Sequence, residues 1–459
     1  MIIPKGVERV LGKAKGKGLF ADLYFEETES TYIVLEGDQL EKVVSGIDCG
    51  VGLRSIYGDF HTAYAYTNEI STKALEDLAA VIGQIVGEGP DAINLGEELQ
   101  IPFLEIKEPP FEAGLEQKIS LVQRANEVAR GVSPEIVQVK VVYQDVYKKI
   151  TILNSEGEWI SGERLYTLLA VQVVAKRGEV IQTGYEPLGG AIGLEIFAKT
   201  PPEEIAEKAA RRALLMLSAR KAPGGTMPVV LSSEAGGTMI HEAVGHGLEA
   251  DLATEGFSVY ANKCGQKVAS SLITVIDDPT LMYQRGFYQF DDEGVRPTKT
   301  VLIENGVLKD FLYDRLTAMK QGRASNGHGR RESYRHRPIP RMSNTYIAPG
   351  PHSPEEIIRS VEKGLLVKKM GGGQVDTISG NFVFEVTEGY LIEKGLLGEP
   401  VRGATISGNG PQILQMIDMV GNDLGFAIGT CGKNGQGVPV SDGQPTLRIP
   451  EIVVGGAVD

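Results

Sequence analysis

Three residues with the side chains of a metal-dependent hydrolase lie close together between Val229 and Leu252, in the segment VVLSSEAGGTMIHEAVGHGLEADL. They are His241, Glu242 and His246. A catalytic zinc site needs neutral imidazoles as ligands and a carboxylate that can reach the attacking water. The residue types in HEAVGH and their order therefore indicate metal-assisted hydrolysis.

The spacing of the two histidines departs from the familiar H-E-x-x-H pattern, in which they are four residues apart. His241 and His246 are five residues apart, and a regular α-helix would turn their side chains about 140° away from each other. Binding one ion therefore requires a π-type bulge or a break in the helix. Gly245 and Gly247 flank the second histidine and should make the backbone permissive there. Spacing alone leaves two interpretations open, a metal site or two helix histidines with structural roles.

A cysteine near the C-terminal end of the chain favours the metal site. Cys431 lies in GTCGKNGQGVPVSDGQPTLRI, which we expect to be a glycine-rich loop between strands. A thiolate is a good zinc ligand, and a catalytic zinc needs three protein ligands with the fourth position left for water. A lone cysteine in an intracellular protein is more often a small core residue, and we expect that role for Cys49 and Cys264.

Composition restricts the classes to which the protein can belong. The 459 residues carry a formal net charge of −14 and are 42% hydrophobic, as expected for a globular protein of two domains. No apolar stretch of about 18 residues predicts a membrane span, and no apolar block near the N-terminus predicts a signal peptide. Three cysteines far apart in sequence do not form a disulfide framework, so we expect a cytoplasmic protein.

One segment of this acidic chain is strongly basic. Arg323 to Arg341, RASNGHGRRESYRHRPIPR, is rich in arginine and also contains histidines. The negative net charge argues against nucleic acid as the main partner, because phosphate binding depends on clustered basic side chains. We expect these arginines to pair with carboxylates elsewhere in the fold. An alternative is that some line a cleft and hold a substrate carboxylate.

Residue patterns predict the elements that position the candidate ligands. Alternation of apolar and polar residues predicts strands in residues 21–68 and 137–185, and glycine-rich strands prevail after residue 250. Helical periodicity and capping residues predict helices at 71–88, 116–130, 202–220 and 354–370, and one beginning near Thr238.

A cluster of proline and glycine, KAPGGTMP, occupies residues 221–228 directly after a long predicted helix. Such a cluster is typical of a boundary between domains. We therefore expect an N-terminal α+β domain at 1–222 and a C-terminal β-rich domain at 223–459. Helices and strands occur in blocks rather than in strict alternation, which favours an α+β fold.

The two motifs together resemble those of the TldD branch of the TldD/PmbA family, and the similarity extends through nearly the whole chain. Further shared stretches are GVGLRSIYGDFHTAYAYTN, DDEGVRPTKTVLIENGVLKDFLYD, RMSNTYIAPG and FVFEVTEGYLIEKG. The HExxxH and late CGK motifs are specific to this branch, because the companion branch (PmbA, also called TldE) lacks the metal motif. The resemblance implies an N-terminal mixed α/β domain with an antiparallel sheet. It also implies a β-rich, barrel-like C-terminal domain that carries the HExxxH helix.

The resemblance further implies the chemistry of the site. Matched position by position, His241, His246 and Cys431 correspond to the family's zinc ligands, and Glu242 corresponds to its catalytic carboxylate. The family relationship implies a zinc-dependent metallopeptidase that hydrolyses unfolded or extended peptides. It also implies a two-fold assembly, either a homodimer or a heterodimer with a TldE/PmbA-like subunit.

The supporting side chains are less clearly defined by the sequence. Glu249 and Asp251 are expected as charges on the helix surface, with orientation of a ligand imidazole as the alternative. A thiolate makes zinc a weaker Lewis acid than a third histidine would, so another group should stabilise the oxyanion. Candidates in the basic segment are Arg330, Arg331, Arg341, His328 and Tyr334.

Two other functions compete with the zinc peptidase. In a thiol hydrolase, Cys431 would be the nucleophile and a histidine its base, so activity would survive a chelator. In a non-enzymatic regulatory or binding protein, any zinc would be structural, with a closed set of four ligands and no need for Glu242. We favour the zinc peptidase, with Glu242 as the general base on the hydrolytic water.

Overall fold

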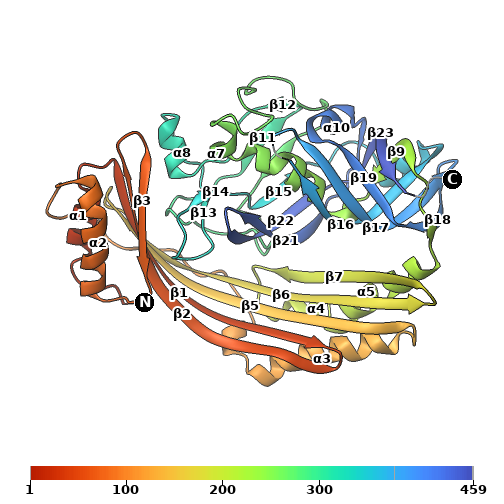
Figure 1. Ribbon diagram of the computed structural model, residues 1–459, viewed down its shortest axis with the longest axis horizontal. Coiled ribbons are helices and arrows are strands. Elements are labelled where there is room, and N and C mark those ends of the chain that lie inside the picture. The colour runs from red at the N-terminus through yellow and green to blue at the C-terminus, as the bar shows by residue number, and fades with distance from the viewer. Residues whose placement is uncertain (1, 377, 457–459) are drawn as a thin grey trace.

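The computed structural model describes residues 2–376 and 378–456. The fold is α+β, with 22% helix and 43% strand, which confirms the predicted class. Figure 1 shows a curved sheet formed by the N-terminal half and a β-rich C-terminal half stacked against it. Among the described residues, no helix combines the length and the apolar character that crossing a bilayer requires.

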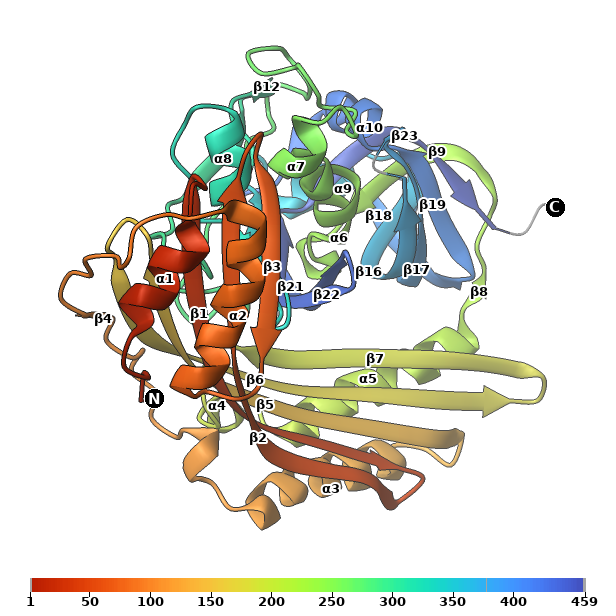
Figure 2. The same ribbon diagram turned by 60° about the vertical axis from the view of Figure 1, so that its left-hand side comes forward.

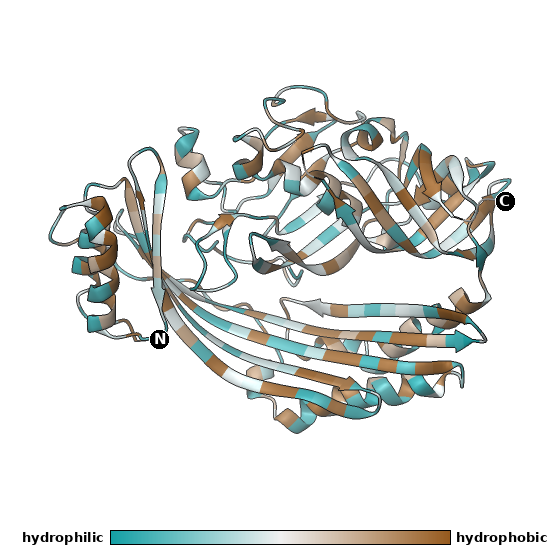
Figure 3. Ribbon diagram, in the orientation of Figure 1, coloured by the Kyte–Doolittle hydropathy of each residue, from teal (hydrophilic) through white to brown (hydrophobic). Residues whose placement is uncertain are grey.

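The N-terminal half is built on one seven-stranded sheet in the order β3-β2-β1-β5-β6, with β4 and β7 both paired to β6. Its strands are β1 (Phe20–Glu36), β2 (Gln39–Tyr57), β3 (His61–Thr67), β4 (Leu99–Gln100), β5 (Ile136–Asn154), β6 (Trp159–Arg177) and β7 (Val180–Gly190). Hydrophobic and hydrophilic residues follow one another closely along the long strands, as the alternation predicted (Figure 3). This is the pattern of a sheet with two differently solvated faces.

Different helices cover the two ends of this long sheet. α1 (Val7–Lys15) and α2 (Thr72–Val86) share an apolar cluster with one end, and α3 (Leu115–Gly131) and α5 (Pro202–Ser218) share another with the far end. Figure 2 shows the first pair beside β3 and the second pair beneath the strands. The short helices α4 (Ile196–Lys199) and η1 (Pro110–Glu112) complete this half.

The predicted helices 71–88, 116–130 and 202–220 are observed as α2, α3 and α5. Ser71 caps α2 as expected, because its hydroxyl accepts the N–H of Ala74 at 3.2 Å. The predicted helix 354–370 is confirmed only at its start, as α9 (Pro354–Arg359), and is wrong beyond it, since strand β16 begins at Lys363. Residues 365–367 pair in parallel with β9. A short apolar run of this kind suits a buried strand as well as a buried helix, so periodicity cannot distinguish them.

The C-terminal half combines a closed barrel with a second sheet. Five strands form the barrel in the order β16-β9-β23-β19-β17, and pairing of β16 with β17 closes it. The second sheet has the order β12-β11-β10-β15-β22-β21, so β21 lies at its edge. One large apolar cluster unites the barrel, this sheet and the segment that carries the two histidines.

The elements of the C-terminal half are mostly short. Its strands are β8 (Arg220–Lys221), β9 (Gly225–Leu231), β10 (Val275–Asp277), β11 (Thr300–Glu304), β12 (Val307–Leu308), β13 (Gly329–Arg330), β14 (Ile339–Pro340), β15 (Asn344–Ile347), β16 (Lys363–Val375), β17 (Asn381–Glu393), β18 (Leu396–Arg402), β19 (Ala404–Asn409), β20 (Met419–Val420), β21 (Gly425–Lys433), β22 (Gln436–Gln444) and β23 (Leu447–Gly455). Its helices are η2 (Ser233–Ala235), α6 (Thr238–Ile240), η3 (His241–Gly245), η4 (His246–Leu248), α7 (Ala250–Ala253), α8 (Arg315–Lys320), α9 (Pro354–Arg359) and α10 (Gly410–Met416).

Buried ion pairs join the two halves. Arg54 of β2 contacts Asp22 of β1 and, at 2.7 Å, Glu293 of the C-terminal half. Arg164 of β6 lies 2.7 Å from Asp292. Separating a buried pair leaves an uncompensated charge, so these contacts hold the halves in a fixed relation. β7 is the last strand of the N-terminal sheet, and β8 is the first strand of the sheets in the C-terminal half. The division into two domains at 222/223 stays a prediction.

Candidate metal centre

The segment that carries the two histidines is not a regular α-helix. α6 passes directly into the π-helical turn η3, which is followed by the 3₁₀ turn η4. The N–H of His246 bonds to the carbonyl of His241, five residues earlier. That hydrogen bond defines a π-type turn. In such a turn the side chains of His241 and His246 are separated by a smaller angle around the helix axis than in an α-helix. Of the two backbone solutions predicted from the spacing, the chain adopts the π-type one.

The glycines beside His246 are required for space rather than for backbone freedom. Gly245 has a φ of −56°, which any residue can adopt. A Cβ there would overlap the sulfur of Met342, and a Cβ at Gly247 would lie 2.9 Å from the ring of Tyr260. The sequence correctly marked these glycines as important, but the predicted reason, a permissive backbone, is wrong. Glycine is required because the side chains of Met342 and Tyr260 leave no room for a Cβ.

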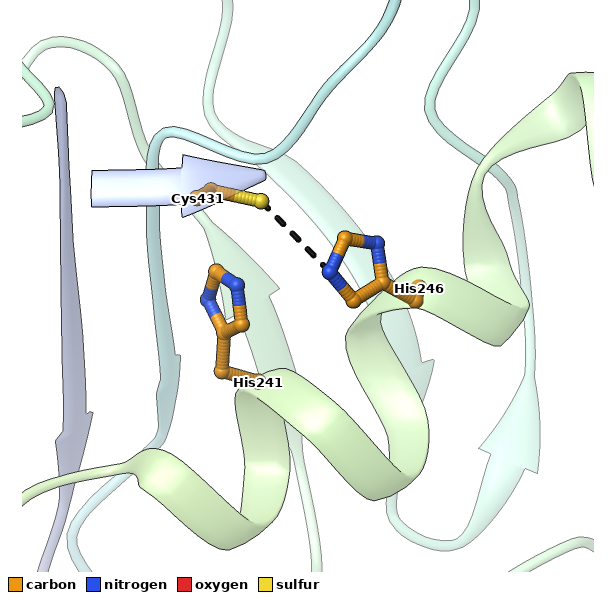
Figure 4. A group of neighbouring side chains, drawn as sticks. All are labelled: His241, His246 and Cys431. Atoms are coloured by element: carbon orange, nitrogen blue, oxygen red, sulfur yellow. Dashed lines mark hydrogen bonds between the residues drawn. The ribbon is translucent and has the colours of Figure 1, made fainter. Parts of the chain in front are cut away.

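The π-helical turn places both imidazoles beside Cys431 (Figure 4). One donor atom from each of the three residues lies within 4.8 Å of the others. The Nε2 of His246 is 3.5 Å from the Sγ of Cys431, and the two imidazole rings are 5.1 Å apart. All three side chains are buried. Cys431 belongs to strand β21 and not to the predicted loop, so a sheet edge holds its sulfur in place.

Electrostatics at this cluster favour a thiolate. Burial raises the pKa of the Cys431 thiol, but hydrogen bonds with His241 and His246 outweigh burial and lower the pKa to about 5. Burial lowers the pKa of His241, and its contact with Cys431 more than compensates, so that pKa is raised. A thiolate is the form of cysteine that binds metals. One thiolate and two imidazoles within reach of one ion form a donor set that suits zinc.

Glu249 is buried and orients one imidazole. Its Oε2 lies 2.9 Å from Nδ1 of His246 and 2.9 Å from Nζ of Lys433. Nδ1–H therefore donates to Glu249, so that Nε2, on the side of Cys431, is the nitrogen available to a metal. Burial raises the pKa of Glu249, but the charges of Lys433 and His246 outweigh burial and lower the pKa to about 2. The expectation of a surface charge is wrong for Glu249. Asp251 is only part-buried and lies 2.7 Å from Lys433.

Replacing Glu249 by glutamine is expected to weaken zinc binding by about 10–100-fold, the usual effect of losing a carboxylate partner of a ligand histidine. Glutamine keeps the size but removes the charge that Lys433 and the imidazole share. Competition with a chromophoric chelator measures the affinity. Asp251→Asn is the matched control, because Asp251 pairs with Lys433 without touching His246. Equal affinities for Glu249→Gln and the wild type would contradict the orienting role.

Lys433 is a supporting residue that was not predicted from the sequence. It lies two positions after Cys431, and alternate residues of a strand point to the same face. The CGK motif therefore contained the signal that would have placed this ammonium group beside the site. Its pKa is raised, because the charges of Glu249 and Asp251 outweigh burial.

Two of the arginines considered as candidates to stabilise an oxyanion, Arg330 and Arg341, donate to backbone carbonyls. Arg341 is fully buried and donates to the carbonyls of Cys431 and Gln436. Arg330 donates to the carbonyl of Met342 at 2.6 Å. Both guanidinium groups thus hold the strands around the candidate ligands. Their hydrogen bonds give them structural roles.

Most of the other basic side chains of the segment are also paired within the fold. Arg323 and Arg335 pair with Asp310 and Asp48, each at 2.6 Å, as expected for arginines that pair with carboxylates. The remaining oxyanion candidates have these contacts: Arg331 with the carbonyl of Asp292, His328 with the hydroxyl of Thr300, and Tyr334 with the carboxylate of Asp48.

The other two cysteines lie away from the core. Cys264 is exposed and Cys49 is half-buried, and neither forms a disulfide. The expectation of two core cysteines is therefore wrong for Cys264 and holds only in part for Cys49. Among the described residues, His241, His246 and Cys431 are the one group of three metal-binding side chains close enough to share an ion.

Comparison with known proteins agrees with these observations. Models of domain 1, the central domain and the C-terminal domain of the PmbA/TldA metallopeptidases match residues 21–85, 108–217 and 224–456. A metalloprotease TldD homolog of Haemophilus influenzae is 38% identical over 95% of this chain and 93% of its own. A zinc metalloprotease TldD homolog of Saccharolobus solfataricus is 30% identical, covering 96% and 97%.

A solved structure shows that the fold is shared more widely. TldE from Thermococcus kodakarensis aligns with a TM-score of 0.75 at 19% identity, covering 96% of this chain and 97% of that one. The family models together span most of the sequence. The chain therefore belongs to the TldD/PmbA family of metallopeptidases, as its motifs predicted.

Proposed function

We propose that the protein is a zinc-dependent peptidase in which His241, His246 and Cys431 hold the ion and Glu242 is the general base. The observation that carries the proposal is the convergence of three buried donors, from the π-helical segment and from β21, within 4.8 Å. Three protein ligands leave one position for water or substrate, which is typical of catalytic rather than structural zinc. The relative named a zinc metalloprotease supports the choice of ion.

Glu242 is the group available to move protons. It follows His241 directly and is half-buried, and its carboxylate has no hydrogen-bond or ion-pair partner in the described part of the chain. Zinc held by the three ligands would supply a Lewis acid that acidifies water and polarises the peptide carbonyl. Glu242 accepts the proton of the attacking water and passes it to the leaving amine. Glu249 fixes the tautomer of His246 throughout.

The strand that carries Cys431 offers a place for an extended peptide. β21 pairs only with β22 among the described strands, so its other edge is open. An open edge can accept a peptide as an added strand through main-chain hydrogen bonds. A groove of about 550 Å³ adjoins β21, lined by residues of β7, β16 and β17 and by Thr238 of α6. We therefore propose unfolded or extended peptides as substrates, because a folded protein cannot present such a strand.

We also propose that the chain functions as a two-fold assembly, either with itself or with a TldE/PmbA-like subunit. The likeness to TldE supports the second arrangement, since a companion with the same fold can present equivalent surfaces. Sedimentation of the chain alone and with a TldE-like subunit distinguishes the two.

Removal of the metal is expected to abolish peptide hydrolysis, and added Zn²⁺ is expected to restore it. The assay follows cleavage of a casein-like unfolded chain before and after dialysis against a chelator, with zinc content measured in parallel. A tightly folded protein serves as the comparison substrate and should be cut far more slowly.

A second candidate function rests on the low pKa of Cys431, which suits a nucleophile. A thiol hydrolase would keep its activity in zinc-free protein and lose it on alkylation of Cys431. Full activity of zinc-free protein would therefore refute the metal-dependent reaction.

A further inference from the structure

A carboxylate that the proposed mechanism does not use lies beside His241. Asp442 of β22 is part-exposed as a residue, but its Oδ1 is buried and has no hydrogen-bond partner among the described residues. The Nδ1 of His241 is also buried and, within the same described ranges, without a partner. Buried polar atoms are nearly always hydrogen-bonded, so this acceptor and this nitrogen call for an explanation.

Strand register places Asp442 on the same side of the sheet as the candidate ligands. β21 and β22 are antiparallel, with Cys431 opposite Val438 and Ala427 opposite Asp442. Directly opposed residues share a face of the sheet, and so do residues separated by two or four positions along one strand. The Asp442 side chain therefore projects from the face that carries the sulfur of Cys431.

The backbone holds Asp442 against the start of the histidine-bearing segment. Its carbonyl accepts the N–H of Gly237 at 3.1 Å, and the carbonyl of Gly237 accepts the N–H of His241 at 2.8 Å. A Cβ at Gly237 would overlap the backbone of Gly443. Only glycine permits this approach. Gly237 therefore links the backbone of Asp442, which carries the unpaired carboxylate oxygen, to the backbone of His241, which carries the unpaired imidazole nitrogen.

Two charged neighbours act on the carboxylate of Asp442: His241 attracts it and Glu242 repels it. Because Oδ1 is shielded from solvent, it faces protein groups rather than a substrate in the groove. An imidazole can donate a hydrogen bond to this oxygen, whereas an ionised Glu242 can only accept one.

We infer that Asp442 is the positioning residue for His241, as Glu249 is for His246. Its carboxylate is linked to Nδ1–H of His241 through one bridging water, which leaves Nε2 free for the metal. The inference rests on the proposed function. Each of the two imidazole ligands then has its own carboxylate partner, one from the segment that follows η4 and one from β22. The β22 partner ties the imidazole of the π-helical turn to the sheet that carries Cys431.

The test compares Asp442→Ala and Asp442→Asn with the wild type. Zinc affinity, measured by competition with a chromophoric chelator, is expected to fall about 10–100-fold in Asp442→Ala. The loss should be smaller in Asp442→Asn, whose amide oxygen still accepts a hydrogen bond. The d–d spectrum of the Co²⁺-substituted protein should change in the same order, because the ring orientation changes. Asp418→Ala is the control, since Asp418 pairs with Arg448 at the surface.

The possible outcomes separate this inference from the proposed function. Unchanged zinc affinity and an unchanged Co²⁺ spectrum in folded Asp442→Ala would overturn the inference alone. So would a variant with normal zinc affinity but a shifted pH profile of kcat, because Asp442 would then act on Glu242. If Asp442→Ala does not fold, equal zinc affinities for Asp442→Asn and the wild type would overturn the inference instead. Failure of the wild type to bind zinc would overturn the proposed function itself.

Discussion

Replacing Glu242 by glutamine is expected to lower kcat for an extended peptide by about 10²–10⁴-fold, the usual contribution of a general base. The zinc content should not change, because Glu242 is not among the three converging donors. Glutamine preserves the shape of the side chain and removes only its ability to accept a proton. Since this carboxylate has no partner in the described ranges, the substitution should also leave the thermal midpoint unchanged. Steady-state kinetics and zinc analysis on the same preparation measure both effects.

Glu304→Gln is the matched control for this prediction. Glu304 of β11 is exposed, lies 3.1 Å from Lys309 and is not part of the groove beside β21. It should keep full activity. If Glu242→Gln retained zinc and most of its kcat, the general-base assignment would be wrong. A protein with purely structural zinc would show the same peptide-binding or regulatory activity in Glu242→Gln as in the wild type, so this variant also tests the non-enzymatic alternative.

The geometry of the candidate site was predictable where helix geometry leaves little choice. A separation of five residues between His241 and His246 is incompatible with one ion on a regular helix. A shared ion therefore demanded a π-type turn or a break, and the π-type hydrogen bond is observed. The approach of Cys431 to these histidines followed from motif resemblance rather than from local pattern. That the three side chains bind a metal stays a prediction.

Other features could not be derived because they depend on tertiary contacts. Residues 363–375 form a strand only because β9 and β17 flank them in the barrel. Glu249 looks like a surface charge until Lys433, far away in sequence, pairs with it in the interior. Gly245 is needed because Met342 occupies the adjoining space. In each case the deciding partner is distant in the chain, so local pattern carries no information about it.

Replacing Cys431 by alanine is expected to remove zinc and to reduce peptide hydrolysis to background. The loss of a direct ligand should exceed the roughly 10–100-fold loss of affinity caused by removing a partner of a ligand. Cys49→Ala and Cys264→Ala are matched controls, because each removes a thiol that is not among the three converging donors. Both should keep the zinc content and the activity of the wild type. Zinc analysis and hydrolysis of an unfolded substrate measure all three variants.

The variant Cys431→Asp distinguishes a ligand from a nucleophile at this position. A carboxylate can coordinate zinc but cannot replace a thiolate as an acyl-transfer nucleophile paired with histidine. If Cys431 is a ligand, Cys431→Asp should bind more zinc than Cys431→Ala and recover part of the activity. If it is a nucleophile, the two variants should be equally inactive whatever their metal content. If Cys431→Asp bound zinc again but were as inactive as Cys431→Ala, Cys431 could not be a ligand alone. The metal would then be in place with an open position, and the reaction would still not occur.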